Sequence, residues 1–171
     1  MTKEYKGKSQ FAMLADALPV RARACLAILA SEVALPHLQQ SPDLELARAP
    51  LNFALTWHRG ETVDLDDWEE LLEAEESSLS FAETRAHSKE ESLAWCVLAD
   101  AMAYVAFLAL RAADRIPWSS LDNMDERTLD DLDENLRTLE PSSIPLMSRA
   151  AAYLARRPDA IPAQVKGQLS L

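Results

Sequence analysis

The chain has 171 residues, of which 49% are hydrophobic and 26% are charged, and its net charge at pH 7 is −11. A chain of this size buries roughly 70% of the surface that its unfolded form exposes, so we expect one folded domain over residues 1–171 and exclude wholesale disorder. The negative charge argues against nucleic acid and anionic membranes as ligands, and it favours a basic protein as partner.

The first part of the chain has the pattern of a loose arm and two helices. Residues 1–9 carry three lysines, and we expect a loose basic arm there. A short amphipathic helix is expected over 11–18. Apolar residues at a 3.6-residue period then predict a helix over 19–35, which Pro36 stops or kinks because proline lacks an amide hydrogen. The absence of a signal-peptide pattern predicts a cytoplasmic protein.

Two further helices are expected between residues 41 and 79. The sequence Ser41-Pro42-Asp43 is a strong helix start, and Pro50 must bend or divide the helix that follows. Gly60 is expected to close that helix. Asp64 is expected to cap the next helix, which extends to Leu79 with Trp68 inside and acids over its outer surface.

The longest helix is expected at the centre of the fold. Ser88 and Glu91 form a capping box, in which a hydroxyl and a glutamate three residues later accept hydrogen bonds from free amides. The helix that follows runs from Lys89 to Arg115 and is apolar nearly all round, which is typical of the buried centre of a bundle. Its most apolar segment, 101–110, is half as long as a membrane-spanning helix.

Two helices and a tail complete the predicted pattern. Asp122 or Asn123 is expected to cap a helix that ends at Leu139, and a last helix is expected over 145–157. Residues 158–171 are expected to be irregular. We therefore predict an all-α, single-domain bundle of six or seven helices with one long central apolar helix.

Acidic residues are concentrated in two stretches. Residues 61–91 hold twelve acids and two bases, and residues 122–140 hold eight acids and two bases. Acids in the first turn of a helix complement its dipole, and acids elsewhere keep a surface solvated. The acids after residue 67, however, continue along the helix without a lysine four residues later to offset their mutual repulsion. We favour a surface kept acidic for a cationic partner, with these contact residues: Asp64, Asp66, Asp67, Glu69, Glu70, Glu73 and Glu76.

Aromatic residues add one candidate to this surface. Trp118 follows Pro117 in a connection outside any helical stripe, where an aromatic side chain can anchor a partner. The other three tryptophans are expected in the core, as is more usual for this residue. We therefore include Trp118 among the predicted partner-binding residues.

No pattern predicts a catalytic or metal site. Glu83 and His87 are four residues apart and occur once, whereas di-iron bundles use paired Glu-x-x-His motifs. Cys25 and Cys96 lie in apolar helical stretches and are expected to be free, buried and unreactive thiols. We therefore predict a protein that is not an enzyme and needs no cofactor or metal. A helical adaptor or scaffold and a small metal-dependent enzyme are the alternatives, and a homodimer is compatible with the sequence.

Three patterns within residues 51–136 carry a family resemblance. They are a helix ending in Ala-Leu-Thr-Trp57 before an acidic helix, a central helix around Trp95, and the Ile116-Pro117 connection before a second acidic helix. This half of the chain resembles the all-helical immunity proteins of bacterial polymorphic-toxin systems, in particular the sixth immunity family. The resemblance implies an antitoxin that binds and blocks a cognate toxin, and the acidic surface implies that this toxin is basic.

Overall fold

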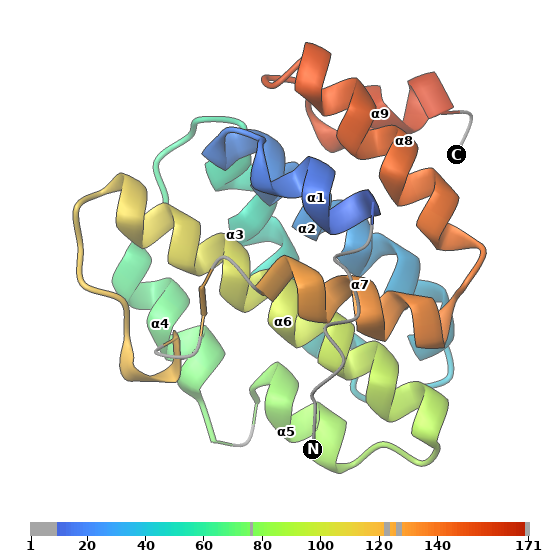
Figure 1. Cartoon of the computed structure of the whole chain (residues 1–171). Coiled ribbons are helices and arrows are strands. Elements are labelled where there is room, and N and C mark those ends of the chain that lie inside the picture. Colours follow the sequence, from blue (N-terminus) through green and yellow to red (C-terminus); the bar gives the residue numbers. More distant parts are fainter. Residues whose placement is uncertain (1–9, 76, 122–123, 126–127, 170–171) are drawn as a thin grey trace, which may run out of the picture.

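The computed structural model describes residues 10–75, 77–121, 124–125 and 128–169, and every regular element in these ranges is a helix (Figure 1). The described ranges contain nine α-helices and three short 3-10 helices but no strand, which confirms the all-α prediction and exceeds the predicted helix number. The loose arm predicted over 1–9 lies outside the described residues. The α-helices are α1 (Gln10–Asp16), α2 (Val20–Ala34), α3 (Arg48–His58), α4 (Leu65–Glu73), α5 (Leu79–Thr84), α6 (Lys89–Ala112), α7 (Thr128–Leu139), α8 (Ser143–Arg156) and α9 (Pro162–Leu169).

Helix α6 is the centre of the molecule, as its apolar sequence predicted. It makes its largest contact with α2 and also packs against α5, α7 and α3. Figure 1 shows α6 running diagonally through the molecule, with α7 crossing it, α4 on the left below the C-terminal end of α6, and α8 at the upper right. By length and composition α6 could cross a membrane, but 72% of its most apolar window is buried inside the molecule, as in the core helix of a folded domain.

Helix boundaries follow the predicted capping signals at three places. The Ser88 hydroxyl accepts a hydrogen bond from the Glu91 amide at 3.0 Å, and the Glu91 carboxylate accepts one from the His87 amide at 2.8 Å. Asp64 caps α4 by accepting from the amides of the next turn. Gly60 closes α3 with a φ of 85°, the left-handed region that favours glycine.

Prolines lie just after the end of one helix and in the first turn of two others. After α2 ends, Pro36 lies in a 3-10 helix, Leu35–Leu38, so the predicted stop is confirmed. A second 3-10 helix, Leu44–Ala47, precedes α3, and Pro50 therefore falls in the first turn of α3, where its missing amide costs no hydrogen bond. Pro145 likewise lies in the first turn of α8, which begins at Ser143 rather than at the proline.

The predicted helix from Asp64 to Leu79 is wrong in its second half. Helix α4 ends at Glu73, and a separate helix, α5, begins at Leu79 with the Ser78 hydroxyl accepting from the Phe81 amide at 3.2 Å. Serine side chains compete for backbone hydrogen bonds in helix interiors and favour caps. The serines at 77 and 78 therefore interrupt an apolar period that otherwise looks continuous.

The C-terminal region also differs from the prediction. Residues 162–169 form α9 instead of an irregular tail, because Pro162 suits a first helical position and Val165 and Leu169 bury one side against the core. The Gln164 side chain accepts a hydrogen bond from the Ile161 amide at 3.0 Å, which gives this backbone group at the start of the helix a partner. The predicted caps of α7, at 122 and 123, lie outside the described residues.

Candidate partner-binding surface

Helix α4 is fixed to the rest of the fold by one side. Trp68 is fully buried, and its ring centroid lies 5.7 Å from that of Phe53 on α3. Leu65 and Leu72, which share this side of the helix, pack partly buried against the core. Because these residues are spaced three and four apart, the opposite side of α4 must face outward.

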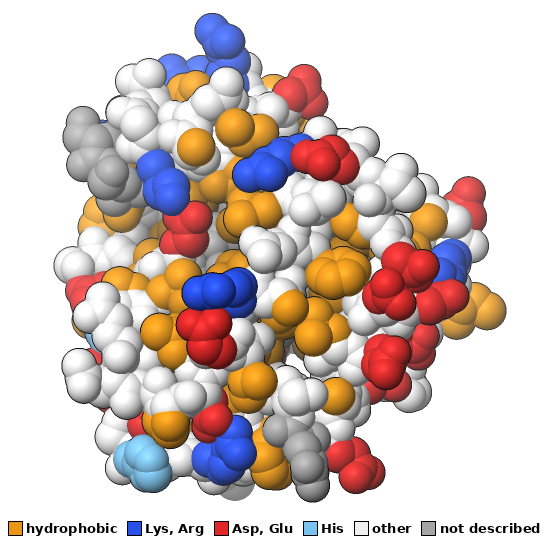
Figure 2. Space-filling view, turned by 180° about the vertical axis from the view of Figure 1, so that it is seen from behind, with side chains coloured by type: hydrophobic (Ala, Val, Ile, Leu, Met, Phe, Trp, Pro, Cys, Tyr) orange, Lys and Arg blue, Asp and Glu red, His pale blue; other side chains and the backbone are white. Residues whose placement is uncertain are grey.

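The outward side of α4 is acidic. We define the acidic face as Asp66, Asp67, Glu70 and Glu73, which are all exposed. Acidic side chains gather on the right of Figure 2, the side on which α4 lies when the molecule is seen from behind. Glu69 is half-buried beside the acidic face, and Glu76 lies outside the described residues.

One carboxylate of the acidic face is neutralised by the fold. An arginine nitrogen of Arg115 lies 2.6 Å from Asp66, and this hydrogen bond raises the pKa of Arg115. Asp64 is partly occupied by capping α4, since it accepts from the amides of Asp66 and Asp67 at 2.9 and 3.3 Å. The remaining acids of α4 form no ion pair with a basic residue in the described part of the chain: Asp67, Glu69, Glu70 and Glu73.

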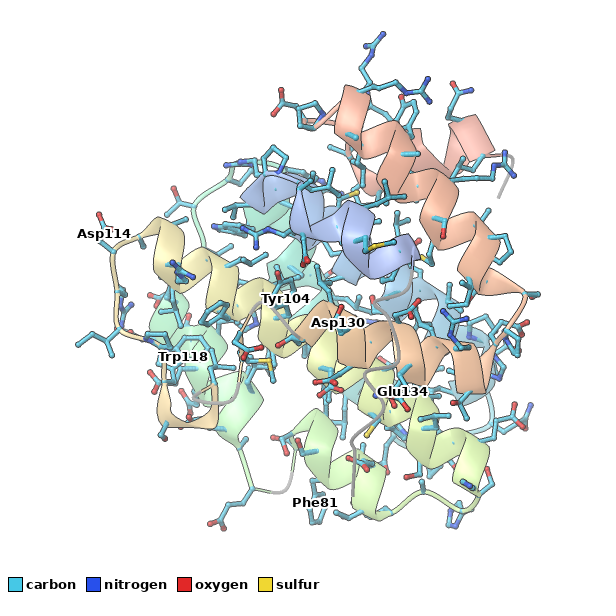
Figure 3. All side chains as sticks on the ribbon, viewed as in Figure 1. Phe81, Tyr104, Asp114, Trp118, Asp130 and Glu134 are labelled. Atoms are coloured by element: carbon cyan, nitrogen blue, oxygen red, sulfur yellow. The ribbon has the colours of Figure 1, made fainter. Side chains whose placement is uncertain are left out.

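The structure places Trp118, the predicted anchor for a partner, in the core. The side chain of Trp118 is only 6% exposed and belongs to the hydrophobic core, so it does not contact a partner in this conformation. Figure 3 shows Asp114 at the tip beyond α6 and Trp118 further along the same connection. Two residues before Trp118, the side chain of Ile116 is 89% exposed. The connection therefore does present a hydrophobic residue, but it is Ile116.

The α6–α7 connection begins earlier than the sequence predicted. Helix α6 ends at Ala112 instead of Arg115, because Asp114 adopts a left-handed conformation with a φ of 53°. The Arg115 amide then donates to the Leu110 carbonyl at 2.9 Å, which closes the helix end. This early end lets the Arg115 side chain reach Asp66 and places the connection beside the start of α4.

Some acids of the second acidic stretch, residues 122–140, interact with other side chains of the fold. Asp133 on α7 is buried and pairs with Arg137 at 3.0 Å. Asp131, on the same helix, and Glu83 of α5 each lie near Asp100 of α6. Burial, with Asp131 and Glu83 as smaller causes, raises the pKa of Asp100 to about 6. Sequence reasoning missed Asp100, which occurs singly in an apolar helix.

Both cysteines are free thiols, as predicted, but only Cys25 is buried, whereas Cys96 is half-buried. Burial is the main cause that raises the pKa of both Cys25 and Cys96 to about 12, and the Cys96 thiol donates a hydrogen bond to Glu83 at 3.4 Å. Thiols with such high pKa values carry little thiolate and are weak nucleophiles. Within the described ranges, no three His, Cys, Asp or Glu side chains gather as metal ligands would.

The geometry defines a class of protein: an all-helical domain with an acidic helix on which, among the described residues, only Asp66 pairs with a basic side chain. The family model described as Immunity protein Imm6 matches residues 22–139, more than half of the chain. The chain belongs to this family of immunity proteins, which act against toxins. The match runs from α2 through α7 and extends further toward the N-terminus than the predicted resemblance. No curated protein and no solved structure matches the chain.

Proposed function

We propose that this chain neutralises a cognate toxin in the cytoplasm by binding it through the acidic face of α4, and that the toxin presents a basic surface there. Membership of the immunity family supports the binding of a toxin. The observation that supports this location is that three of the four carboxylates of the acidic face have no internal cation among the described residues.

Repulsion within α4 gives this arrangement a physical reason. Asp66 and Glu70 are four residues apart, and Glu70 and Glu73 are three apart, so their carboxylates are neighbours on one side of the helix. Like charges at these spacings destabilise a helix by a few tenths of a kcal/mol per pair, about 0.2–0.5. A basic partner relieves the repulsion on binding, and the same charges accelerate its encounter with the protein.

The proposal is tested by reversing charge on the acidic face. The variant combines Glu70→Lys with Glu73→Lys, both at exposed positions in the last turn of α4, where lysine complements the helix dipole. The matched control combines Glu134→Lys with Asp159→Lys, two exposed acids on other elements that give the same change of net charge. Both variants are co-expressed with the cognate toxin domain, identified as the one from which the parent chain protects cells.

Cell survival is the readout. We expect the control to protect as the parent does, and the α4 variant to fail while its circular dichroism spectrum and unfolding midpoint stay close to those of the parent. Equal protection by the two variants would contradict the proposal. Equal loss would show that net charge, and not the location of the charge, governs binding.

A further inference from the structure

A hollow of about 460 Å³ lies beside the start of α4, where α2 begins and where α3 and α6 end. Its volume falls within the range of small binding pockets, roughly 300–1,000 Å³. Most of its lining residues are apolar and come from three separate segments of the chain: Val20, Trp57, Val63, Leu65, Ala109, Ala112 and Ala113.

One exposed hydrophobic side chain lines this hollow, and a second lies in the connection that follows its last lining residue. Val20 lines it and is 37% exposed, and Ile116 lies three residues beyond the lining residue Ala113. These are two of the three large hydrophobic side chains that are exposed in the described part of the chain. Figure 2 shows hydrophobic side chains next to the gathered acids on the same face. An apolar hollow that polar residues surround is typical of an interaction surface.

The hollow is formed before any partner arrives. The Arg21 guanidinium donates to the His58 carbonyl at 2.7 Å and lies 5.7 Å from the centroid of the half-buried Trp57 ring, so it joins α2 to the end of α3. The turn at Gly60 brings its backbone against the same guanidinium, which a Cβ at this position would meet at 3.4 Å. A hollow held in this way needs little reorganisation to accept a side chain.

The border of the hollow is acidic. Glu61 lines it, and Asp64, Asp66 and Asp67 follow Val63 and Leu65 at the start of α4. The ion pair between Arg115 and Asp66 ties the connection that carries Ile116 to this border. An apolar centre with a charged border is the usual anatomy of a protein–protein interface, in which the centre supplies most of the binding energy.

We infer that this hollow, together with Ile116, is the apolar centre of the toxin interface and takes a hydrophobic side chain that lysines or arginines flank in the toxin. The inference rests on the proposed function, because it assigns a contact within the same surface. Charge complementarity identifies the occupant: the acids at the border favour bases beside the inserted side chain. The acidic face then sets the association rate constant of the toxin, and the hollow sets its dissociation rate constant.

Two substitutions test the hollow without disturbing the core. Ile116→Ser removes an almost fully exposed side chain, and Ala112→Trp fills the hollow from the last residue of α6, which is exposed. The control, Ala155→Trp, places the same ring at an exposed position near the end of α8. The probe is the purified cognate toxin domain, from which the parent chain protects cells, inactivated by substitution. Biolayer interferometry measures both rate constants.

We expect Ile116→Ser and Ala112→Trp to raise the dissociation rate constant about 10- to 100-fold with little change in association, while the control behaves as the parent does. If both dissociate at the parental rate although Glu70→Lys with Glu73→Lys abolishes binding, the inference is wrong and the proposed function stands. If none of the substitutions changes either rate, both are wrong. A parent chain that is dimeric by light scattering and becomes monomeric with Ile116→Ser would assign the hollow to a second copy and overturn the inference.

Discussion

Replacing Asp100 by asparagine should stabilise the protein at neutral pH. Asp100 lies on α6 near two other carboxylates, those of Asp131 and Glu83, and is half-buried. Burial, followed by the repulsion of those two groups, raises its pKa from 3.8 to about 6. At pH 7 the folded protein therefore holds an ionised carboxylate in an unfavourable environment. Asparagine keeps the size of the side chain and removes the charge.

The magnitude follows from the pKa. Because the pKa is raised on folding, the folded chain retains a proton between about pH 4 and 6 that the unfolded chain has released. The stabilisation from this proton is complete below pH 3.8 and is lost as the pH rises through about 6. One pKa unit corresponds to about 1.4 kcal/mol, which sets an upper limit of about 3 kcal/mol, and partial contact with water reduces the expected gain to about 1–2 kcal/mol.

Urea denaturation at pH 4, 5, 6 and 7 measures this effect. The free energy of unfolding of Asp100→Asn should equal that of the parent near pH 4 and exceed it by the stated amount at pH 7. The control Asp159→Asn makes the same change at an exposed position between α8 and α9, and its difference from the parent should not vary with pH. A difference for Asp100→Asn that is constant from pH 4 to 7, or a loss of stability at pH 7, would refute the reasoning.

Three other predictions concern packing, capping and thiol reactivity. Trp68→Ala should lower the free energy of unfolding by about 3–5 kcal/mol in urea titrations, because it leaves a cavity under α4; a loss below 1 kcal/mol would contradict the packing described. Ser88→Ala should cost about 1 kcal/mol in the same assay, and the exposed Ser80→Ala should cost little; equal effects would exclude a capping role for Ser88. Cys25 and Cys96 should react with Ellman's reagent at pH 8 only after unfolding, since their pKa values are raised to about 12, and fast labelling of the native protein would contradict this.

The sequence predicts the long helices well because their apolar residues repeat over many turns. Helix α6 and the capping signal of Ser88 follow from local pattern alone. The short helices α5 and α9 were missed for opposite reasons. For α5, the apolar period continues to Leu79, so the serine cap at Ser78 could not be told from the interior of a longer helix. For α9, the helix is short and buries only two hydrophobic side chains of one side, which is too few to form a clear period. Tertiary packing, which local sequence does not encode, decides such short elements.

The candidate surface was predictable only where one helix forms it. The spacing of acids along α4 places them opposite Trp68, and the structure agrees. The burial of Trp118 depends on how its connection folds back onto the core, and the exposure of Ile116 depends on the left-handed turn at Asp114. The hollow was invisible to sequence reasoning because its walls come from segments that are far apart in the chain.

The ionic-strength dependence of toxin association tests the central proposal most directly. The association rate constant of the parent chain with the toxin domain should fall steeply between about 20 and 300 mM NaCl, because salt screens the exposed carboxylates of α4. The Glu70→Lys, Glu73→Lys variant should associate slowly at low salt and show a much flatter dependence. Parent and variant curves of equal slope would contradict the proposal that the acidic face of α4 receives the toxin.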